Sequence, residues 1–137
     1  MAPTPKLDLT VLAGSFTVHR FAADSQIPDA VFTSAFYNIS RTAAELSIVC
    51  DSTLKLESLK AETGWSCIAI AGPLDFSLTG ILAALATPLA AAQVSILAVS
   101  TFDTDHLLVK TDKLPLARQV LQAAGHTFGG RAGMVSV

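Results

Sequence analysis

The segment AGPLDFSLTGILAALATPLAAA, residues 71–92, decides how the rest of the chain is interpreted. Gly72 and Pro73 end one apolar run, and the Ala- and Leu-rich run that follows has the length of a helix. Asp75 is the only Asp, Glu, Lys or Arg among the 40 residues from 63 to 102. A lone charge beside so much apolar surface has to be solvated, placed at a helix cap or paired with an opposite charge.

The same apolar run is long enough to raise the question of a membrane span. Residues 78–100 form a 23-residue stretch without a charge, which would cross a bilayer as a helix. The stretch contains Thr87-Pro88 and Gln93, however, and no basic residue flanks it closely. A buried helix followed by a buried strand fits this pattern better, so we expect no association with a membrane.

Composition limits the kinds of partner. The chain has 137 residues, of which 51% are hydrophobic and 15% charged, and its net charge is −2 without a block of Lys or Arg. This balance argues against nucleic acid as a partner. The apolar excess predicts a homo-oligomer, most simply a dimer. The N-terminal residues lack the apolar core of a signal peptide, and buried free thiols at Cys50 and Cys67 are favoured over a disulfide, so we expect a cytoplasmic protein.

In the first half of the chain, residues 7–12 and 15–21 alternate between apolar and polar, and the turn at Ala13-Gly14 predicts that they pair as a hairpin. Residues 24–35 predict a loop and a short helix that starts near Pro28 or Asp29. Residues 36–41 and 45–50 predict two more strands, and residues 52–62 predict a helix that Gly64 ends.

The second half follows a similar plan. We expect a strand at 65–72, a helix at 76–92, strands at 94–101 and 106–110 around a turn, a helix at 112–125 and a short strand at 126–128. Residues 39–49 and 99–109 also share Ser40/Ser100 and Val49/Val109, so a duplication with an offset near 60 is plausible.

These elements predict an α+β fold of two ferredoxin-like βαββαβ units in tandem, with antiparallel sheets and helices on one face. Residues 1–63 would form the first unit, circularly permuted because residues 7–12 supply its fourth strand. Residues 64–128 would form the second unit, with 126–128 as a fourth strand beside 65–72. Residues 129–137 are expected to be a flexible tail.

The duplicated plan, together with GPLDFSLTGIL at 72–82 and STFDTDHLLVK at 100–110, resembles the ACT domains, which are regulatory modules that bind amino acids. The likeness is greatest to small stand-alone bacterial ACT-domain proteins, which are similar to the regulatory part of aspartate kinase and to cytosolic arginine-sensor proteins. It is strong over residues 65–125. Many ACT domains have Pro-Gly at the helix entry, where this chain has Thr79-Gly80.

The resemblance implies a site for a free amino acid between the loop at residues 72–81 and the end of the second strand at residues 100–105. Backbone groups would hold the polar ends of the ligand, and Asp75 would pair with a cation. The ligand-binding residues implied in this way are Asp75, Phe76, Ser77, Leu78, Thr79, Gly80, Ile81, Ser100, Thr101, Phe102 and Asp103.

Physical chemistry supports this site but leaves alternatives open. The unpaired N–H groups at a helix start favour a carboxylate, and Gly80 lets a ligand approach the backbone. Asp75 or Ser77 would equally serve as an N-cap, and the two roles are compatible. Asp103 and Asp105 fit a solvated turn better than a metal site. We therefore expect no metal, no cofactor and no catalytic residue.

Two functions remain open at this point. The first is a non-catalytic regulatory protein that binds an amino acid. The second is a structural protein–protein interaction module without a small ligand.

Overall fold

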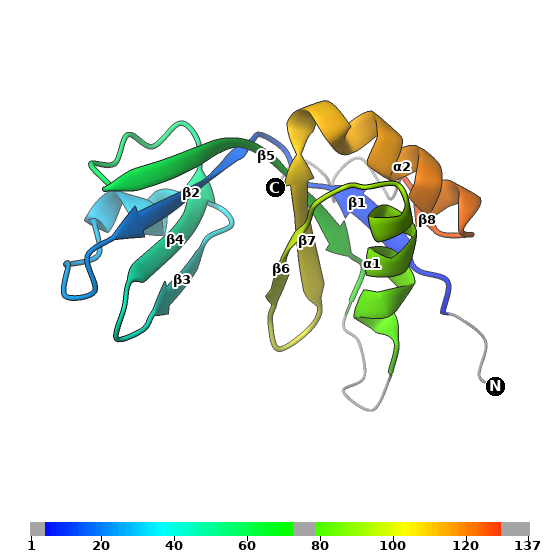
Figure 1. Ribbon diagram of the computed structural model, residues 1–137, viewed down its shortest axis with the longest axis horizontal. Helices are drawn as coiled ribbons and strands as arrows, with labels where there is room; N and C mark the ends of the chain where they lie inside the picture. Colours follow the sequence, from blue (N-terminus) through cyan, green and yellow to red (C-terminus); the bar gives the residue numbers. More distant parts are fainter. Residues whose placement is uncertain (1–4, 73–78, 130–137) are drawn as a thin grey trace. The chain divides into compact units, whose positions relative to one another are not determined.

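The computed structural model describes residues 5–72 and 79–129, and Figure 1 follows the elements along the chain. The strands within these residues are β1 (Asp8–Val11), β2 (Phe16–Phe21), β3 (Asn38–Arg41), β4 (Leu46–Asp51), β5 (Lys60–Ile70), β6 (Leu97–Ser100), β7 (Asp105–Lys110) and β8 (Thr127–Phe128). The α-helices are α1 (Ile81–Ala91) and α2 (Leu114–Ala123), and the short 3-10 helices are η1 (Asp29–Thr33) and η2 (Thr111–Lys113).

The chain divides into two compact units. We call Gly14–Trp65 the inserted unit, because it lies in sequence between the two segments of the other unit. We call the other one, formed by Met1–Ala13 and Ser66–Val137, the helical unit. Strand β5 contributes its first residues to the inserted unit and its last residues to the helical unit.

The inserted unit is a sheet in the order β3-β4-β2-β5, with every neighbouring pair antiparallel. One face of it carries a small apolar core around Phe21, Leu46 and Ile48, on which Val31 of η1 also packs. Residues 52–59, which we call the strap, connect β4 to β5 and add Leu54 and Leu56 to this core.

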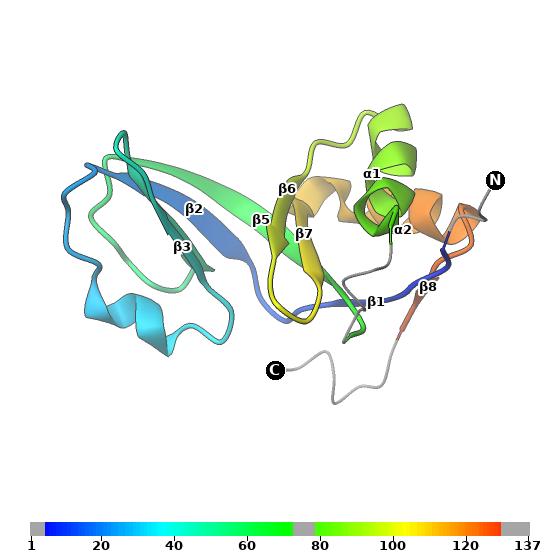
Figure 2. The ribbon, with the colours of Figure 1, turned by 90° about the horizontal axis from the view of Figure 1, so that it is seen from below.

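The helical unit has a mixed sheet. Strand β7 pairs with β5 and β6, β1 pairs antiparallel with β5, and β8 pairs parallel with β1. Figure 2 shows α1 and α2 on one side of these strands, and both helices contribute to the larger core of the molecule. The buried side chains of this core include Leu9, Ile68, Leu85, Leu89, Leu107 and Leu121.

The predicted hairpin between residues 7–12 and 15–21 is wrong. Strand β1 pairs with β5, in the register Leu9↔Ile70, and Leu12 N donates to Cys67 O at 2.9 Å. Leu9 is fully buried in the core of the helical unit. Alternation predicts a strand but does not name its partner, and burying Leu9 beside two helices favours β5. The permuted first unit, which depended on this hairpin, is wrong with it.

Strand β8 also has a different neighbour from the one predicted. It exists at residues 127–128, but it pairs with β1 instead of β5, and the pair is parallel. The prediction of purely antiparallel sheets is therefore corrected to a mixed sheet.

The predicted helix at residues 52–62 is wrong as well. Lys60 already belongs to β5, and the strap has turn and irregular backbone. Ser52 and Ser58 make side-chain hydrogen bonds to β2, which compete with helix formation. Leu54 and Leu56 are two residues apart and both pack on the core, so burial here has the period of a strand.

Other expectations are confirmed. Strands β3, β4, β6 and β7, the short helix at Asp29 and the helix before Gly125 lie where the sequence predicted them. Cys50 and Cys67 are buried free thiols. Among the described residues, no helix is long and apolar enough to cross a membrane.

Candidate functional site

The carboxyl end of β5 and the turn between β6 and β7 are joined by a side-chain hydrogen bond. Thr104 Oγ1 donates to the Ile70 carbonyl at 3.0 Å. The turn is closed by Thr101 N, which donates to the Thr104 carbonyl at 2.8 Å, and by the Thr101 hydroxyl, which donates to the same carbonyl at 3.0 Å. These bonds hold the turn beside the point where the chain leaves β5.

Helix α1 begins at Ile81 with Gly80 at the N-cap position, so neither Asp75 nor Ser77 is its N-cap. Gly80 has φ +76°, in the left-handed region that suits glycine. Apart from its chain neighbours, no heavy atom of the described residues lies within 4 Å of the place where a Cβ would stand. The first intrahelical bond here runs from Ala84 N to Gly80 O at 2.9 Å. The amides of residues 81–83 precede this bond and have no acceptor within the helix.

The structure places some of the predicted ligand-binding residues at exposed positions. Thr79 and Gly80 are exposed at the start of α1, and Ser100, Thr101, Phe102 and Asp103 are exposed at the turn. Phe102 has 80% of its surface accessible. The side chain of Ile81 instead packs in the core, so its backbone N–H is the group that it could present to a ligand. Asp75, Phe76, Ser77 and Leu78 lie outside the described residues.

The turn is acidic. Asp103 is exposed and Asp105 is half-buried next to His106. Burial lowers the pKa of His106, and the Asp105 carboxylate opposes that effect. Within residues 5–72 and 79–129, no three His, Cys, Asp or Glu side chains come together as metal ligands. The described part of this site therefore offers hydroxyls, backbone groups and carboxylates.

An open groove of about 520 Å³ runs from the start of α1 along that helix. Thr79 and Gly80 line the groove at the start of α1, and small α1 residues such as Ala83 and Thr87 line its length. Lys6, two residues before β1, lines it as well. Lys6 Nζ donates to the Ala124 carbonyl at 2.9 Å, so this ammonium caps the carboxyl end of α2.

His126 fixes the relation of β1 to α1. It is buried; its Nδ1 accepts from Leu7 N at 3.1 Å, and its Nε2 lies 3.0 Å from the Ala84 carbonyl. The amide donor and the carbonyl acceptor together select the neutral tautomer with its proton on Nε2. The sequence alone did not indicate a role for this residue or for Thr104. The Thr101-x-x-Thr104 spacing, which lets each threonine bond across a tight turn, was the available signal.

Buried thiols add no nucleophile to this unit. Burial raises the pKa of Cys67 to about 12, so the thiol stays protonated at neutral pH.

A model of the ACT domain matches residues 60–123, and a model of an N-terminal domain matches residues 14–53. The chain belongs to the ACT-domain family. This ACT-domain protein is 37% identical over 123 residues to the Homo sapiens protein named cytosolic arginine sensor for mTORC1 subunit 1. The match covers 83% of this chain and 36% of the human protein. The chain thus spans well under half the length of the curated relatives that it matches.

Two solved structures are similar to this chain. A crystal structure of an Agrobacterium tumefaciens protein has 37% sequence identity and a TM-score of 0.86, and the match covers 92% of this chain and 94% of that one. The regulatory subunit of aspartate kinase from Thermus thermophilus has a TM-score of 0.61 at 9% identity, over 85% of this chain and 97% of that one. At that identity the likeness shows the fold alone.

Proposed function

We propose that this ACT-domain protein is a non-catalytic regulatory protein that binds a free amino acid at the start of α1. The observation that carries the proposal is the hydrogen bond from Thr104 to the Ile70 carbonyl, because it holds the turn at the end of β5. The amides of residues 81–83 and the exposed Gly80 are the backbone groups available on the other side.

The chemistry of the site suits a zwitterion. A helix start favours a carboxylate by about 0.3–1 kcal/mol at an exposed end. The opposite end of the ligand would meet carboxylates, Asp103 at the turn and, by the family resemblance, Asp75 in the loop. A cationic side chain fits this acidity best. L-Arginine is therefore the first ligand to test, and it is also the amino acid in the name of the human relative.

Regulation would follow from differential binding. A ligand shifts a conformational or assembly equilibrium only by as much as it prefers one state. We propose that the protein acts in this way in the cytoplasm, the location that the human relative's name states for that protein.

We also propose that the protein forms a homodimer. Helix α1 contains no charged residue and only one polar side chain, Thr87, although Leu82, Ala83 and Ala90 are exposed. A helix that is apolar all round is normally buried, so a second copy is the simplest cover for this face. Light scattering at micromolar concentration should give twice 14.3 kDa, and a mass of one chain would contradict the dimer.

The strand orders support a tandem of ferredoxin-like units in which the second unit is the permuted one. In the inserted unit the chain runs through β2, η1, β3, β4, the strap and β5, and the strands lie side by side in the order β3-β4-β2-β5. Along the chain, η1 and the strap stand where a ferredoxin-like unit has its two helices. In the helical unit, β1 takes the place beside β5 that a fourth strand holds in a ferredoxin-like unit.

A thermal-shift screen against the twenty amino acids tests the function. A ligand at 100 times its Kd adds about 2.7 kcal/mol of stability. We expect a cationic amino acid to raise the Tm most. A flat screen at millimolar ligand would favour the alternative, an interaction module that uses the exposed apolar face of α1.

The site itself is tested with Asp75→Asn, which removes a charge and keeps the size of the side chain. Loss of a charge-assisted hydrogen bond costs about 1.5–3 kcal/mol, so Kd should rise by a factor of about 10–150. Asp24→Asn, an exposed aspartate of the inserted unit, is the matched control and should leave Kd unchanged. Equal affinity for both variants and the wild type in calorimetry would show that Asp75 does not bind the ligand.

A further inference from the structure

His19 is a buried histidine of the inserted unit whose two ring nitrogens have different surroundings. Only 5% of the residue is accessible. Its Nδ1 lies 2.8 Å from the Ser58 hydroxyl in the strap. Its Nε2 is buried, and no hydrogen-bond partner for it occurs among the residues that the structure describes. A neutral imidazole carries one N–H, and with that N–H at Nδ1 and Ser58 as its acceptor, Nε2 has no proton to place.

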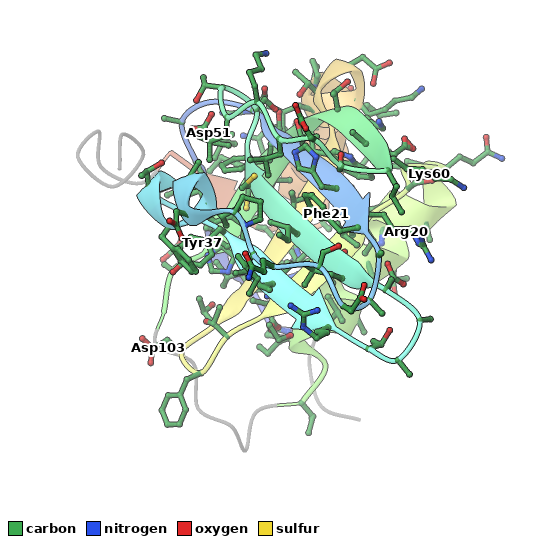
Figure 3. The ribbon with its side chains drawn as sticks, turned by 90° about the vertical axis from the view of Figure 1, so that its left-hand side faces the viewer. Arg20, Phe21, Tyr37, Asp51, Lys60 and Asp103 are labelled. Carbon is green, nitrogen blue, oxygen red and sulfur yellow. The ribbon has the colours of Figure 1, made fainter. Side chains whose placement is uncertain are left out.

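The strap is held to β2 by few polar contacts. Thr17 Oγ1 lies 2.8 Å from Ser52 Oγ at one end, and the His19–Ser58 contact lies at the other. Leu59 N donates to the Arg20 carbonyl at 2.9 Å directly after it. Figure 3 labels Asp51 and Lys60, the residues immediately before and after the strap. Ser52 N also donates to the Ser15 carbonyl at 2.9 Å, and Leu54 N donates to the Asp51 carbonyl at 3.1 Å. The packing of Leu54 and Leu56 completes the attachment of the strap.

Among the described residues, the two direct strand neighbours of His19 carry no charge. Strand register places Ile48 of β4 and Ala61 of β5 directly beside it, and the Phe21 ring is 6.1 Å away. Cys50, on the same face of β4, is the nearest titratable neighbour by register. The charged groups on the packed elements are Asp51 at the end of β4, exposed Lys55 and Glu57 on the strap, and Lys60 and Glu62, which pair with residues of β2 on its other face.

We propose that the strap is a proton-sensitive clasp, which is closed while His19 is neutral and opens when His19 takes up a proton. A protonated ring carries a second N–H at Nε2, and inside the closed unit this donor and its charge have no partner among the described residues. Release of Ser58 lets water reach the ring. Burial lowers the pKa of His19, which has the sign that this coupling requires.

The clasp goes beyond amino-acid binding, since it lies in the inserted unit and uses no residue of the candidate site. Opening would expose Leu54, Leu56 and the apolar face of β4 beneath them. Acidification would thereby change the surface that this unit offers to other molecules.

Amide hydrogen exchange on the full chain tests the clasp. The probes are the amides of Leu54 and Leu59, which bond to Asp51 O and Arg20 O. With an exposed imidazole pKa of about 6.5, linkage to one proton raises the opening constant about tenfold between pH 7.5 and pH 5.5. Protection factors corrected for intrinsic exchange should fall by that factor. The His126 amide, bonded to Leu121 O in the helical unit, is the internal reference and should change much less than tenfold.

Two variants separate the clasp from general acid sensitivity. His19→Gln keeps a hydrogen-bonding side chain and removes the titration, so the tenfold change should disappear. Ser58→Ala should open several-fold more often at both pH values and keep the pH dependence. Unchanged protection of Leu59 between pH 7.5 and 5.5 in the wild type, or the same tenfold change in His19→Gln, would overturn the proposal.

A measurement on the wild type alone guards against a variant that fails to fold. The NMR chemical shifts of the His19 imidazole should keep the values of a neutral ring while the Leu59 amide is protected from exchange. A ring that titrates at its ordinary pKa under a closed strap would also overturn the proposal.

Discussion

The two units cover similar sheets in different ways. In the helical unit, α1 and α2 bury Leu85, Leu89 and Leu121 completely against the strands. In the inserted unit, the five-residue η1 and the strap do the covering, and Leu54 and Leu56 are only partly buried. Less apolar area is removed from water in the inserted unit, so individual hydroxyl contacts matter more to its closure. We therefore expect the helical unit to be the more rigid of the two and the inserted unit to open more readily.

The largest expected effect is a difference in the stability lost when a leucine is shortened in each of the two cores. Leu85→Ala empties a fully buried position of α1 and should lower the free energy of unfolding by about 2–5 kcal/mol. Leu56→Ala in the strap removes a half-buried side chain and should cost about 1 kcal/mol. Urea denaturation of both variants measures the difference, and equal losses would show that the two cores are equally important to stability.

Glycines with positive φ give a second comparison. Gly125 (φ +101°) ends α2, and Gly64 (φ +79°) lies in β5 within the inserted unit. Alanine in the left-handed region costs about 1–2 kcal/mol at either place. A Cβ at Gly125 would also stand 2.9 Å from the Lys6 side chain, whereas at Gly64 no heavy atom of the described residues, apart from its chain neighbours, lies within 4 Å of that position.

Gly125→Ala should therefore destabilise the protein more than Gly64→Ala in thermal denaturation. Adding Lys6→Ala should remove part of the excess at Gly125 and leave the cost at Gly64 unchanged. If Lys6→Ala gives the same increment in both backgrounds, contact with Lys6 is not the cause.

The turn of the candidate site should be less sensitive. Thr104→Val removes the donor to the Ile70 carbonyl and should cost about 0.5–1.5 kcal/mol. Thr104→Ser keeps the hydroxyl and is the matched control. Thr104→Val should also weaken ligand binding in calorimetry, because the turn would no longer be fixed beside β5. A loss of stability without any change in Kd would remove the turn from the site.

The smallest expected effect is the pH dependence of the helical unit. Burial lowers the pKa of His106 below its ordinary 6.5, so the unfolded chain binds more protons than the folded one near that pH. Stability from this group is present above pH 6.5 and is lost as the pH falls from 6.5 toward the folded pKa. His106→Gln should reduce the change in the midpoint of chemical denaturation between pH 7 and pH 5.5. An unchanged slope would assign the dependence to other groups.

Local patterns in the sequence predicted most elements but not their neighbours. The uncharged run after Gly80 and the stop at Gly125 placed α1 and α2, because helix length and glycine termination depend on nearby residues. The partner of β1 depends on which core buries Leu9, and alternation contains no information about that choice.

The strap shows why one helix prediction failed. Residues 52–62 contain Leu54, Leu56 and Leu59, a spacing that fits a helix or a strand. In the structure Leu59 is 66% exposed, and Leu54 and Leu56 supply the burial. The hydroxyls of Ser52 and Ser58 contact Thr17 and His19, and these contacts favour the non-helical backbone of the strap. Each contact joins residues more than 30 positions apart in the sequence. For the same reason the sequence could suggest Gly80 and Thr101 as candidate site residues but could not reveal the bond from Thr104 to Ile70.

An NMR titration tests the central claim most directly, that an amino acid binds at the start of α1 in the helical unit. The titrant is the amino acid that raises the Tm most in the thermal-shift screen. We expect the largest amide shift changes at Gly80, at residues 81–83 and at Thr101–Thr104, with Val18 and Leu54 of the inserted unit nearly unchanged. Changes centred on the inserted unit, with Gly80 and Thr101 unaffected, would contradict the account.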